Sequence, residues 1–180
     1  MFITSKPIIK CVTDLVSDKE DDVIVADLGC GAGDLIIDLA TNLSPEARLY
    51  AVDVQKSLLE RVKNKARDQG HENVMTVWSD LEGDGHTAIA EGSLDAAMLV
   101  NVMFQIQDKM AMAREASRLV KKSGALIISD WRDSFGGLGP QNDDLFVLED
   151  AVAWCEDNGF FVNKVEHPTD YHYILIATKE

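Results

Sequence analysis

Three glycines at alternate positions are the residues of this chain best suited to bind a ligand. Gly29, Gly31 and Gly33 directly follow an apolar run at residues 23–28, which predicts a buried strand. Apolar residues at helical spacing come next and predict a helix that begins at Asp34. Glycine permits a tight turn and lets a ligand approach the backbone, while a helix N-terminus offers free N–H groups. The pattern therefore predicts a turn that cradles a polar ligand.

The spacing of these glycines indicates the class of ligand. Dinucleotide-binding turns have the pattern G-x-G-x-x-G. Here the pattern is G-x-G-x-G, and Asp34 stands where the dinucleotide fingerprint needs its third glycine. The turn therefore departs from the pattern of nicotinamide and flavin dinucleotide sites. A tight turn without any ligand is the alternative explanation.

Acidic residues follow two further predicted strands. Asp53 ends a strand at residues 48–53, twenty residues beyond Gly33. A carboxylate in this position can accept hydrogen bonds from both hydroxyl groups of a ribose. Asp80 follows a strand at residues 74–78, and its alternative role is to begin a turn. Asp53, in register with the glycine turn, therefore favours a ribose-containing ligand.

In this order, the segments resemble the class I S-adenosylmethionine (SAM)-dependent methyltransferases. Residues 25–34 resemble motif I of that family, residues 94–101 resemble its fourth strand, and residues 119–131 resemble the helix, turn and strand that follow. In the last segment Ser123 and Gly124 stand where the family usually has a Pro-Gly pair. The resemblance covers nearly the whole chain, but it does not identify the methyl acceptor.

The resemblance implies SAM as the cofactor and gives roles to individual residues. Asp27 would lie near the amino group of the methionine moiety, Asp53 would bind the ribose, and Asp80 would meet the adenine amino group. Asn101, at the end of the fourth strand, would lie beside the methyl donor. No metal site is expected. The expected cofactor-binding residues are Asp27, Gly29, Cys30, Gly31, Gly33, Asp53, Val54, Asp80, Leu81 and Asn101.

Predicted strands and helices alternate along the chain, which indicates an α/β fold with a parallel sheet and helices on both faces. The resemblance implies a three-layer α/β/α Rossmann-like methyltransferase fold, whose mostly parallel seven-stranded sheet has the order 3-2-1-4-5-7-6 and one antiparallel strand. We expect residues 1–180 to form a single SAM-binding domain. The expected strands are residues 23–28, 48–53, 74–78, 96–101, 125–130, 161–166 and 172–178, and the expected helices are residues 8–16, 34–43, 57–69, 109–121 and 145–158, with a helical turn at 87–90.

Composition limits the classes of partner and compartment. The net charge is −14, and an acidic surface repels phosphates, so nucleic acid is disfavoured as the acceptor. No apolar run is long enough to insert into a membrane, and the first ten residues lack the layout of a signal peptide. Cys11, Cys30 and Cys155 show no C-x-x-C spacing, which predicts free thiols in a reducing compartment. We therefore expect a cytoplasmic protein.

The methyl acceptor is expected at the carboxyl ends of the parallel strands, where ligands bind in such sheets. Methyl transfer from a sulfonium is an in-line displacement, so the protein must mainly align donor and acceptor and exclude water. The glycine-rich loop at residues 133–141 could form part of a lid. Candidate pocket residues at this edge are Asn101, Phe104, Gln105, Trp131, Arg132, Tyr171 and His172.

Three of these residues, His172, Trp131 and Tyr171, are the catalytic candidates. His172 could take a proton from a hydroxyl or ammonium acceptor, or it could be a structural histidine. Trp131 could face the sulfonium through a cation–π interaction, or it could be a core aromatic. An enolate, thiolate or metalloid acceptor needs no base, so the reaction class does not depend on finding one.

The resemblance favours a SAM-dependent methyltransferase that acts on a small molecule, as in small members related to quinone and metalloid methylases. Those relatives often carry extra acceptor-binding segments, so a homodimer or a partner protein could complete the acceptor site. The alternatives are a protein methyltransferase, a catalytically silent SAM-binding scaffold, and an aminopropyl transferase that uses decarboxylated SAM.

Overall fold

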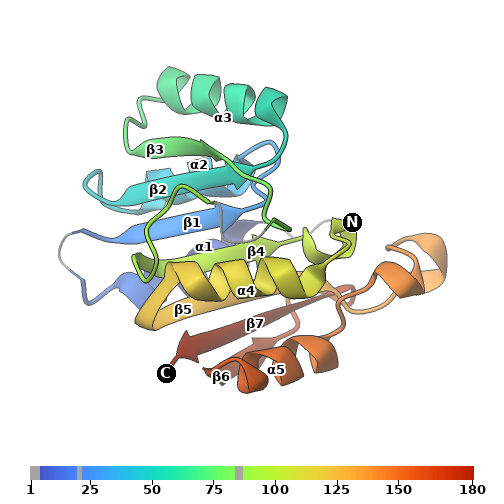
Figure 1. Cartoon of the computed structure of the whole chain (residues 1–180). Helices are drawn as coiled ribbons and strands as arrows, with labels where there is room; N and C mark the ends of the chain where they lie inside the picture. Colours follow the sequence, from blue (N-terminus) through green and yellow to red (C-terminus); the bar gives the residue numbers. More distant parts are fainter. Residues whose placement is uncertain (1–4, 20–21, 84–86) are drawn as a thin grey trace.

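The computed structural model describes residues 5–19, 22–83 and 87–180. A central sheet lies between two layers of helices (Figure 1). Two segments fall partly outside the described residues. They are the first ten residues, which were expected to lack the layout of a signal peptide, and the turn expected after Asp80. The strands are β1 (Ile24–Leu28), β2 (Arg48–Asp53), β3 (Val74–Trp78), β4 (Leu94–Val100), β5 (Val120–Trp131), β6 (Phe160–Glu166) and β7 (His172–Lys179). The helices are α1 (Ser5–Val16), α2 (Asp34–Asn42), α3 (Lys56–Asp68), α4 (Lys109–Leu119) and α5 (Leu148–Asp157), with single 3₁₀ turns η1 (Met103–Gln105), η2 (Phe135–Gly137) and η3 (Asn142–Asp144).

The seven strands have the order β3-β2-β1-β4-β5-β7-β6, which confirms the predicted order. Strands β1 to β5 run parallel to one another, and β7 runs antiparallel to both β5 and β6. Because of this reversal, the first residue of β7, His172, pairs with the last residue of β5, Trp131. The start of β7 therefore returns to the sheet edge where the parallel strands end.

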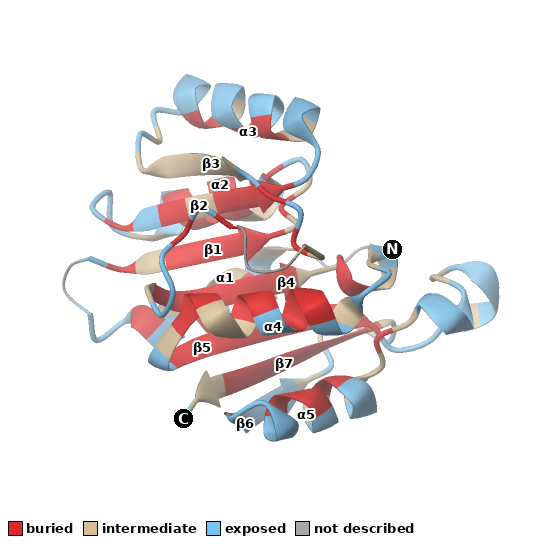
Figure 2. Cartoon of the chain, viewed as in Figure 1, coloured by how far each residue is buried: buried red, intermediate tan, exposed pale blue. Residues whose placement is uncertain are grey.

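The strands between the two edges of the sheet are buried on both faces, as their nearly continuous apolar sequences require, whereas the edge strands β3 and β6 are only partly buried. Helices α1, α2 and α3 cover one face with side chains such as Ile8, Ile36 and Val62. Helices α4 and α5 cover the other face with side chains such as Met112 and Trp154. Figure 2 shows the buried strands in red and the outward surfaces of the helices in pale blue. The strand ends and the loops that follow them are thus the parts of the sheet open to ligands.

The helical turn predicted at residues 87–90 is wrong, because this segment is irregular. The backbone N–H of Thr87 donates to Glu115 Oε1 (3.2 Å), and its hydroxyl lies 3.0 Å from Ser79 Oγ. Arg118 in turn donates to the same Glu115 carboxylate. Arg118 Nη2 also donates to the carbonyl oxygen of Thr87 (3.4 Å), so side chains of α4 pair with both backbone groups of Thr87.

The fifth strand begins earlier than predicted, at Val120 rather than at residue 125. Val120 pairs with Leu94 at the start of β4, before a register shift in the ladder. Helix α4 accordingly ends at Leu119. Helix α5 begins at Leu148, later than the predicted start at residue 145. These boundaries move by a few residues without changing which element ends at the ligand-binding edge.

Candidate functional site

The glycine turn after β1 is held against β2. The backbone N–H groups of Gly29 and Cys30 both donate to the carbonyl oxygen of Val52, at 2.8 and 2.9 Å. Gly29, Gly31 and Gly33 have φ values of +82°, +54° and +76°, a region that residues with a Cβ rarely adopt. The predicted tight turn is therefore present.

The three glycines meet different surroundings. A Cβ atom on Gly29 would overlap the side chain of Val102, and one on Gly33 would lie 2.5 Å from a methyl group of Val62. A Cβ atom on Gly31 would meet nothing within 4 Å. Gly29 and Gly33 thus allow close packing within the protein, whereas Gly31 leaves free space beside its backbone for a ligand.

Asp53, the last residue of β2, points its carboxylate at the glycine turn. Its Oδ2 accepts the backbone N–H of Gly31 (2.9 Å), and its Oδ1 accepts the backbone N–H of Gln55 (2.8 Å). Each carboxylate oxygen can accept a second hydrogen bond. The two backbone bonds fix the carboxylate and leave it capacity for two hydroxyl groups of a ribose.

A pocket of about 320 Å³ opens beside this carboxylate, at the carboxyl ends of β1, β2 and β3. That volume lies in the range of small-molecule sites. The pocket is lined by six of the predicted cofactor-binding residues, namely Gly29, Gly31, Asp53, Val54, Asp80 and Leu81. Gln105, which was expected in the acceptor pocket, lines this pocket as well. Sequence reasoning missed the remaining lining residues, which are Gln55, Leu58, Ser79, Glu82, Val102, Ile106 and Met112.

Acidic side chains also organise the far wall of this pocket. Asp80 Oδ1 accepts the backbone N–H of Glu82 (3.0 Å), so Asp80 both lines the pocket and stabilises the turn that was its alternative role. Glu82 Oε2 accepts the N–H groups of Gln107 and Asp108. These bonds join the loop after β3 to the loop after β4, and together they form one side of the pocket.

Trp78 ends β3 and contacts a residue that lines this pocket, although it does not line the pocket itself. Its indole N–H donates to the carbonyl oxygen of Val54 (2.8 Å), and Lys56 Nζ lies 5.0 Å from the centre of the ring. The side chain is 54% exposed although it is a large aromatic. The hydrogen bond fixes an exposed ring against a residue that lines the pocket.

Four predicted cofactor-binding residues do not line the pocket: Asp27, Cys30, Gly33 and Asn101. Asp27 is buried, and among the described residues no donor reaches its carboxylate. Burial and the nearby charge of Asp53 raise the pKa of Asp27 to about 7. Burial also raises the pKa of the Cys30 thiol, which keeps it protonated. Contacts of these four residues with a cofactor stay predictions.

Asn101 lies directly after β4 in a left-handed backbone conformation, with a φ of +53°. Asparagine tolerates this conformation better than most residues. Its N–H donates to Ser129 of β5 (2.8 Å), and its carbonyl oxygen accepts from the side chain of Gln105 (3.0 Å). The side-chain Oδ1 is buried and has no hydrogen-bond partner among the described residues.

The three catalytic candidates gather at the ends of β5 and β7. The ring of Trp131 lies 4.5 Å from that of His172 and 6.5 Å from that of Tyr171, measured between ring centres. His172 is fully buried, which lowers the pKa of its imidazole. Its Nδ1 lies 3.1 Å from the hydroxyl of Thr169. The sequence therefore predicted their proximity, while their catalytic roles stay predictions.

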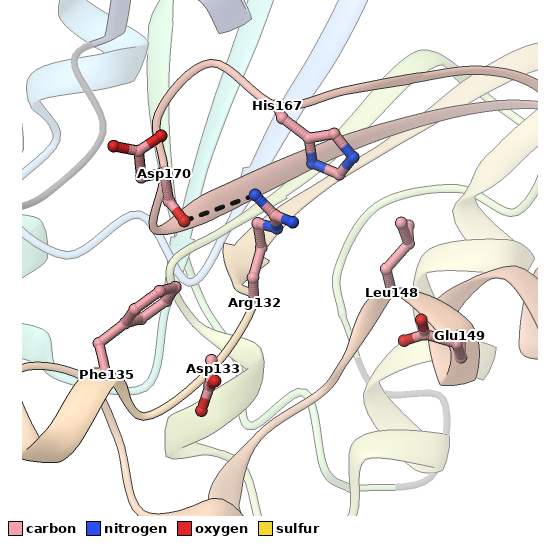
Figure 3. A pocket seen from close by; sticks show the side chains of 7 residues that line it. All are labelled: Arg132, Asp133, Phe135, Leu148, Glu149, His167 and Asp170. Carbon is pink, nitrogen blue, oxygen red and sulfur yellow. Dashed lines mark hydrogen bonds between the residues drawn. The ribbon is translucent and has the colours of Figure 1, made fainter.

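Figure 3 shows a second pocket, of about 380 Å³, which none of the three catalytic candidates lines but which their chain neighbours Arg132 and Asp170 do. Arg132 Nη1 donates to the carbonyl oxygen of Asp170 (3.5 Å), and the ring of Phe135 meets the ring of Tyr171 edge-on at 4.8 Å. Asp133 and Phe135 belong to the loop predicted as a lid. The lining residues are Arg132, Asp133, Phe135, Leu148, Glu149, His167 and Asp170.

Comparison with known proteins agrees with this geometry. A family model described as a methyltransferase domain matches residues 19–178, which is most of the chain. The chain belongs to the class I SAM-dependent methyltransferase family. The sheet order and flanking helices of this methyltransferase domain are those of the family's Rossmann-like fold. SAM is accordingly its cofactor, and the residues around Gly31 and Asp53 fit it because they offer free space and an anchored carboxylate.

Individual relatives show how far the likeness extends. A SAM-dependent methyltransferase of Aquifex aeolicus superposes with a TM-score of 0.81 at 20% identity, covering 95% of this chain and 88% of that one. A proposed type 11 methyltransferase of Sulfolobus solfataricus is 28% identical with a TM-score of 0.72, covering 95% and 90% of the two chains. A demethylmenaquinone methyltransferase of Lactococcus lactis is 25% identical over 104 residues, which is 57% of this chain and 40% of that protein.

The curated relatives are longer proteins, and the chain spans between 29 and 40% of their length. Their complete activities therefore do not transfer directly to this methyltransferase domain. Within residues 5–19, 22–83 and 87–180, no helix has the length and apolarity needed to cross a membrane.

Proposed function

We propose that this methyltransferase domain transfers the methyl group of SAM to a small-molecule acceptor. The observation that carries the proposal is the hydrogen bond between Gly31 and Asp53 on the wall of the first pocket. That bond joins the open glycine turn and the ribose-type carboxylate into one rigid unit. A relative named for a small-molecule acceptor, the demethylmenaquinone methyltransferase of Lactococcus lactis, supports the choice of acceptor class.

Each carboxylate of the site has a distinct task in this proposal. Asp53 accepts two ribose hydroxyls, Asp80 accepts from the adenine amino group, and Asp27 balances the ammonium group of the methionine moiety. The negative potential of these side chains suits a ligand with two cationic groups. When bound, SAM supplies a methyl group that its positive sulfonium already activates. The protein then has to align the acceptor and exclude water.

The acceptor is proposed to lie at the ends of β4, β5 and β7, beside Asn101, Trp131 and His172. In such sheets, ligands bind outside the carboxyl ends of the strands. The loop at residues 133–141 packs over this edge, since a Cβ atom on Gly139 would lie 2.8 Å from the indole of Trp131. A loop that covers the acceptor would keep water away from the displacement.

The cellular compartment is proposed from the state of the cysteines. Cys11, Cys30 and Cys155 are all free and buried in the structure. Free thiols are compatible with a reducing compartment. We therefore propose that the methyl transfer takes place in the cytoplasm.

The proposal is tested by calorimetric titration of the purified chain with SAM, S-adenosylhomocysteine and NADH. We expect micromolar binding of the first two compounds and none of NADH. An acceptor screen with a labelled methyl donor follows, with small molecules and protein extracts in separate arms. Label incorporated only into protein would replace the small-molecule proposal with the protein-methyltransferase alternative. SAM binding without any transfer would favour the silent scaffold or a site completed by a partner.

A further inference from the structure

Three buried side-chain atoms have no hydrogen-bond partner among the described residues: Asn101 Oδ1, Trp131 Nε1 and His172 Nε2. They belong to the ends of β4, β5 and β7, which are neighbours in the sheet. A buried polar atom without a partner is costly, and native proteins rarely keep one without a reason. The concentration of three such atoms at the ligand-binding edge points to a ligand that pairs with them.

The hydrogen bonds around Thr169 determine which nitrogen of His172 carries its proton. The hydroxyl oxygen of Thr169 accepts the backbone N–H groups of Tyr171 (3.2 Å) and His172 (3.1 Å). A hydroxyl has two acceptor positions and one donor. Its contact with His172 Nδ1 must therefore be the one in which the hydroxyl donates. Nδ1 is the acceptor, so in the neutral ring Nε2 carries the hydrogen.

Two N–H donors consequently belong to neighbouring rings at this edge. Trp131 Nε1 is a donor only, and His172 Nε2 is a donor in the tautomer that Thr169 imposes. The two residues are register partners across β5 and β7, and their ring centres are 4.5 Å apart. Both side chains are more than nine-tenths buried. Each donor is therefore shielded from water. A hydrogen bond is electrostatically stronger in such a buried environment than in water.

We propose that Trp131 Nε1–H and His172 Nε2–H bind the carbonyl or phenolate oxygen of an enol or phenol acceptor, while Asn101 Oδ1 accepts a second polar hydrogen of the same molecule. This inference rests on the proposed function, because it names the acceptor class of the same reaction. An oxygen that carries negative charge complements two donors, whereas an ammonium nitrogen has no lone pair with which to accept from either N–H group. In this arrangement His172 donates a hydrogen bond to the molecule that receives the methyl group, and it does not act as a base.

The tautomer is tested first, on the full chain without any ligand. Nitrogen-15 spectra of the imidazoles distinguish a protonated Nε2 from a protonated Nδ1, and His172→Gln identifies the resonance of this ring. We expect a protonated Nε2 at neutral pH. A protonated Nδ1, or a charged ring, would overturn the proposal. This measurement does not depend on SAM binding.

Thermal unfolding of Trp131→Phe gives a second reading that also needs no ligand. The substitution removes the indole N–H and keeps an aromatic ring. Since that N–H has no partner within the described residues, we expect no loss of the melting temperature beyond that of Trp154→Phe, a buried indole away from the strand ends. A markedly larger loss for Trp131→Phe would mean that the N–H already has a structural partner, and the proposal would fail.

Binding is then measured with 4-nitrophenolate as the probe and nitrobenzene as the control that lacks the oxygen. The chain is titrated with and without S-adenosylhomocysteine, and the indole N–H resonance of Trp131 is followed. We expect the probe, but not the control, to shift this resonance. Trp131→Phe should weaken binding at least tenfold, His172→Leu similarly, and His172→Gln should restore part of it because glutamine keeps a donor.

The outcomes separate this inference from the proposed function. Equal binding of the probe by Trp131→Phe and by the unmodified chain, or no movement of the Trp131 resonance, overturns the donor pair. Failure of S-adenosylhomocysteine to bind counts against the proposed function, while the arm without that compound still tests the donors. Trp154→Phe should leave the affinity for the probe unchanged.

Discussion

Asp53 Oδ2 accepts the backbone N–H of Gly31 at 2.9 Å, so the acid that ends β2 is fixed by the turn that follows β1. The bond spans two neighbouring parallel strands, which pair from Ile24 with Arg48 to Leu28 with Val52. Any ligand that touches the backbone at Gly31 therefore also meets the carboxylate. The position of the ribose-type acid depends on the same sheet register that places the turn.

Asp53→Ala should weaken SAM binding by about 1.5–3 kcal/mol, the scale of hydrogen bonds to a charged group, or roughly tenfold to a hundredfold. Calorimetric titration measures the change. Asp34→Ala is the matched control. Asp34 is an exposed acid that does not line the pocket, and its carboxylate pairs with Lys65 (2.5 Å). Equal affinities of Asp53→Ala and the unmodified chain would refute the assignment of Asp53 to the ribose.

Gly31→Val should abolish SAM binding while the protein stays folded, because the new side chain would project into the space beside the turn. The positive φ of Gly31 makes any side chain unfavourable by roughly 1–2 kcal/mol. Gly70→Val is the control, since Gly70 has a φ of +75° and open space but lies away from the pocket. Both variants should lose similar stability in urea. If Gly31→Val still binds SAM normally, the turn does not contact the cofactor.

The pKa of Asp27, raised to about 7 by burial and by the charge of Asp53, predicts two opposite dependences on pH. An unfolded aspartate has a pKa of about 3.9. Between pH 4 and 7 the folded state thus binds more protons than the unfolded state, and the free energy of unfolding falls as pH rises. SAM affinity should instead rise up to about pH 7, because the ligand's ammonium group pairs with the ionised carboxylate.

Asp27→Asn tests both dependences. It should flatten the decline of the free energy of unfolding by roughly 4 kcal/mol between pH 4 and pH 8, and it should remove the rise of SAM affinity over the same range. Asp130, whose pKa burial raises to about 6, contributes to the decline in both proteins, so the difference between them isolates Asp27. Identical pH profiles for the two proteins would show that Asp27 does not titrate in this range.

Asp130→Asn should destabilise the protein by about 1–3 kcal/mol. The buried carboxylate of Asp130 accepts the backbone N–H groups of Met103 (2.9 Å) and Trp131 (2.8 Å), so it joins the loop after β4 to the end of β5. An amide can accept with one oxygen only, which leaves one N–H without its partner. Urea unfolding measures the loss, and the exposed Asp133→Asn should be neutral by comparison.

The glycine turn and Asp53 were predictable because local chemistry decides them, whereas the roles of Asp27 and Asp80 were predicted from the family resemblance. A turn with positive φ at alternate positions demands glycine, and Asp53 sits where a parallel strand must end. The apolar wall of the pocket was not predictable in this way. Ile106 and Met112 line it, but in the sequence they cannot be told from core residues of the segment that follows β4. Such contacts depend on how a loop folds back over the sheet.

The irregular segment at residues 87–90 illustrates a different limit of the sequence. Its composition suits a helical turn, yet the structure bonds Thr87 to Glu115 of α4 instead. This hydrogen bond joins residues 28 positions apart and overrides the local preference for a helical turn. No pattern within residues 87–90 predicts it. Likewise, Asn101 combines a left-handed conformation with a hydrogen bond from its N–H to the carbonyl oxygen of Ser129 on the next strand, and neither is visible in the local sequence.

The exposed indole of Trp78 supplies this domain with an optical reporter of its own. Trp131 and Trp154 are buried, so the emission of Trp78 is distinguished by its contact with solvent. Its ring is tethered to Val54, a residue on the wall of the first pocket. A ligand that fills that pocket should alter the fluorescence of Trp78, and Trp78→Phe should remove the signal. Occupancy can therefore be followed in real time, without a label, in every variant that keeps this tryptophan.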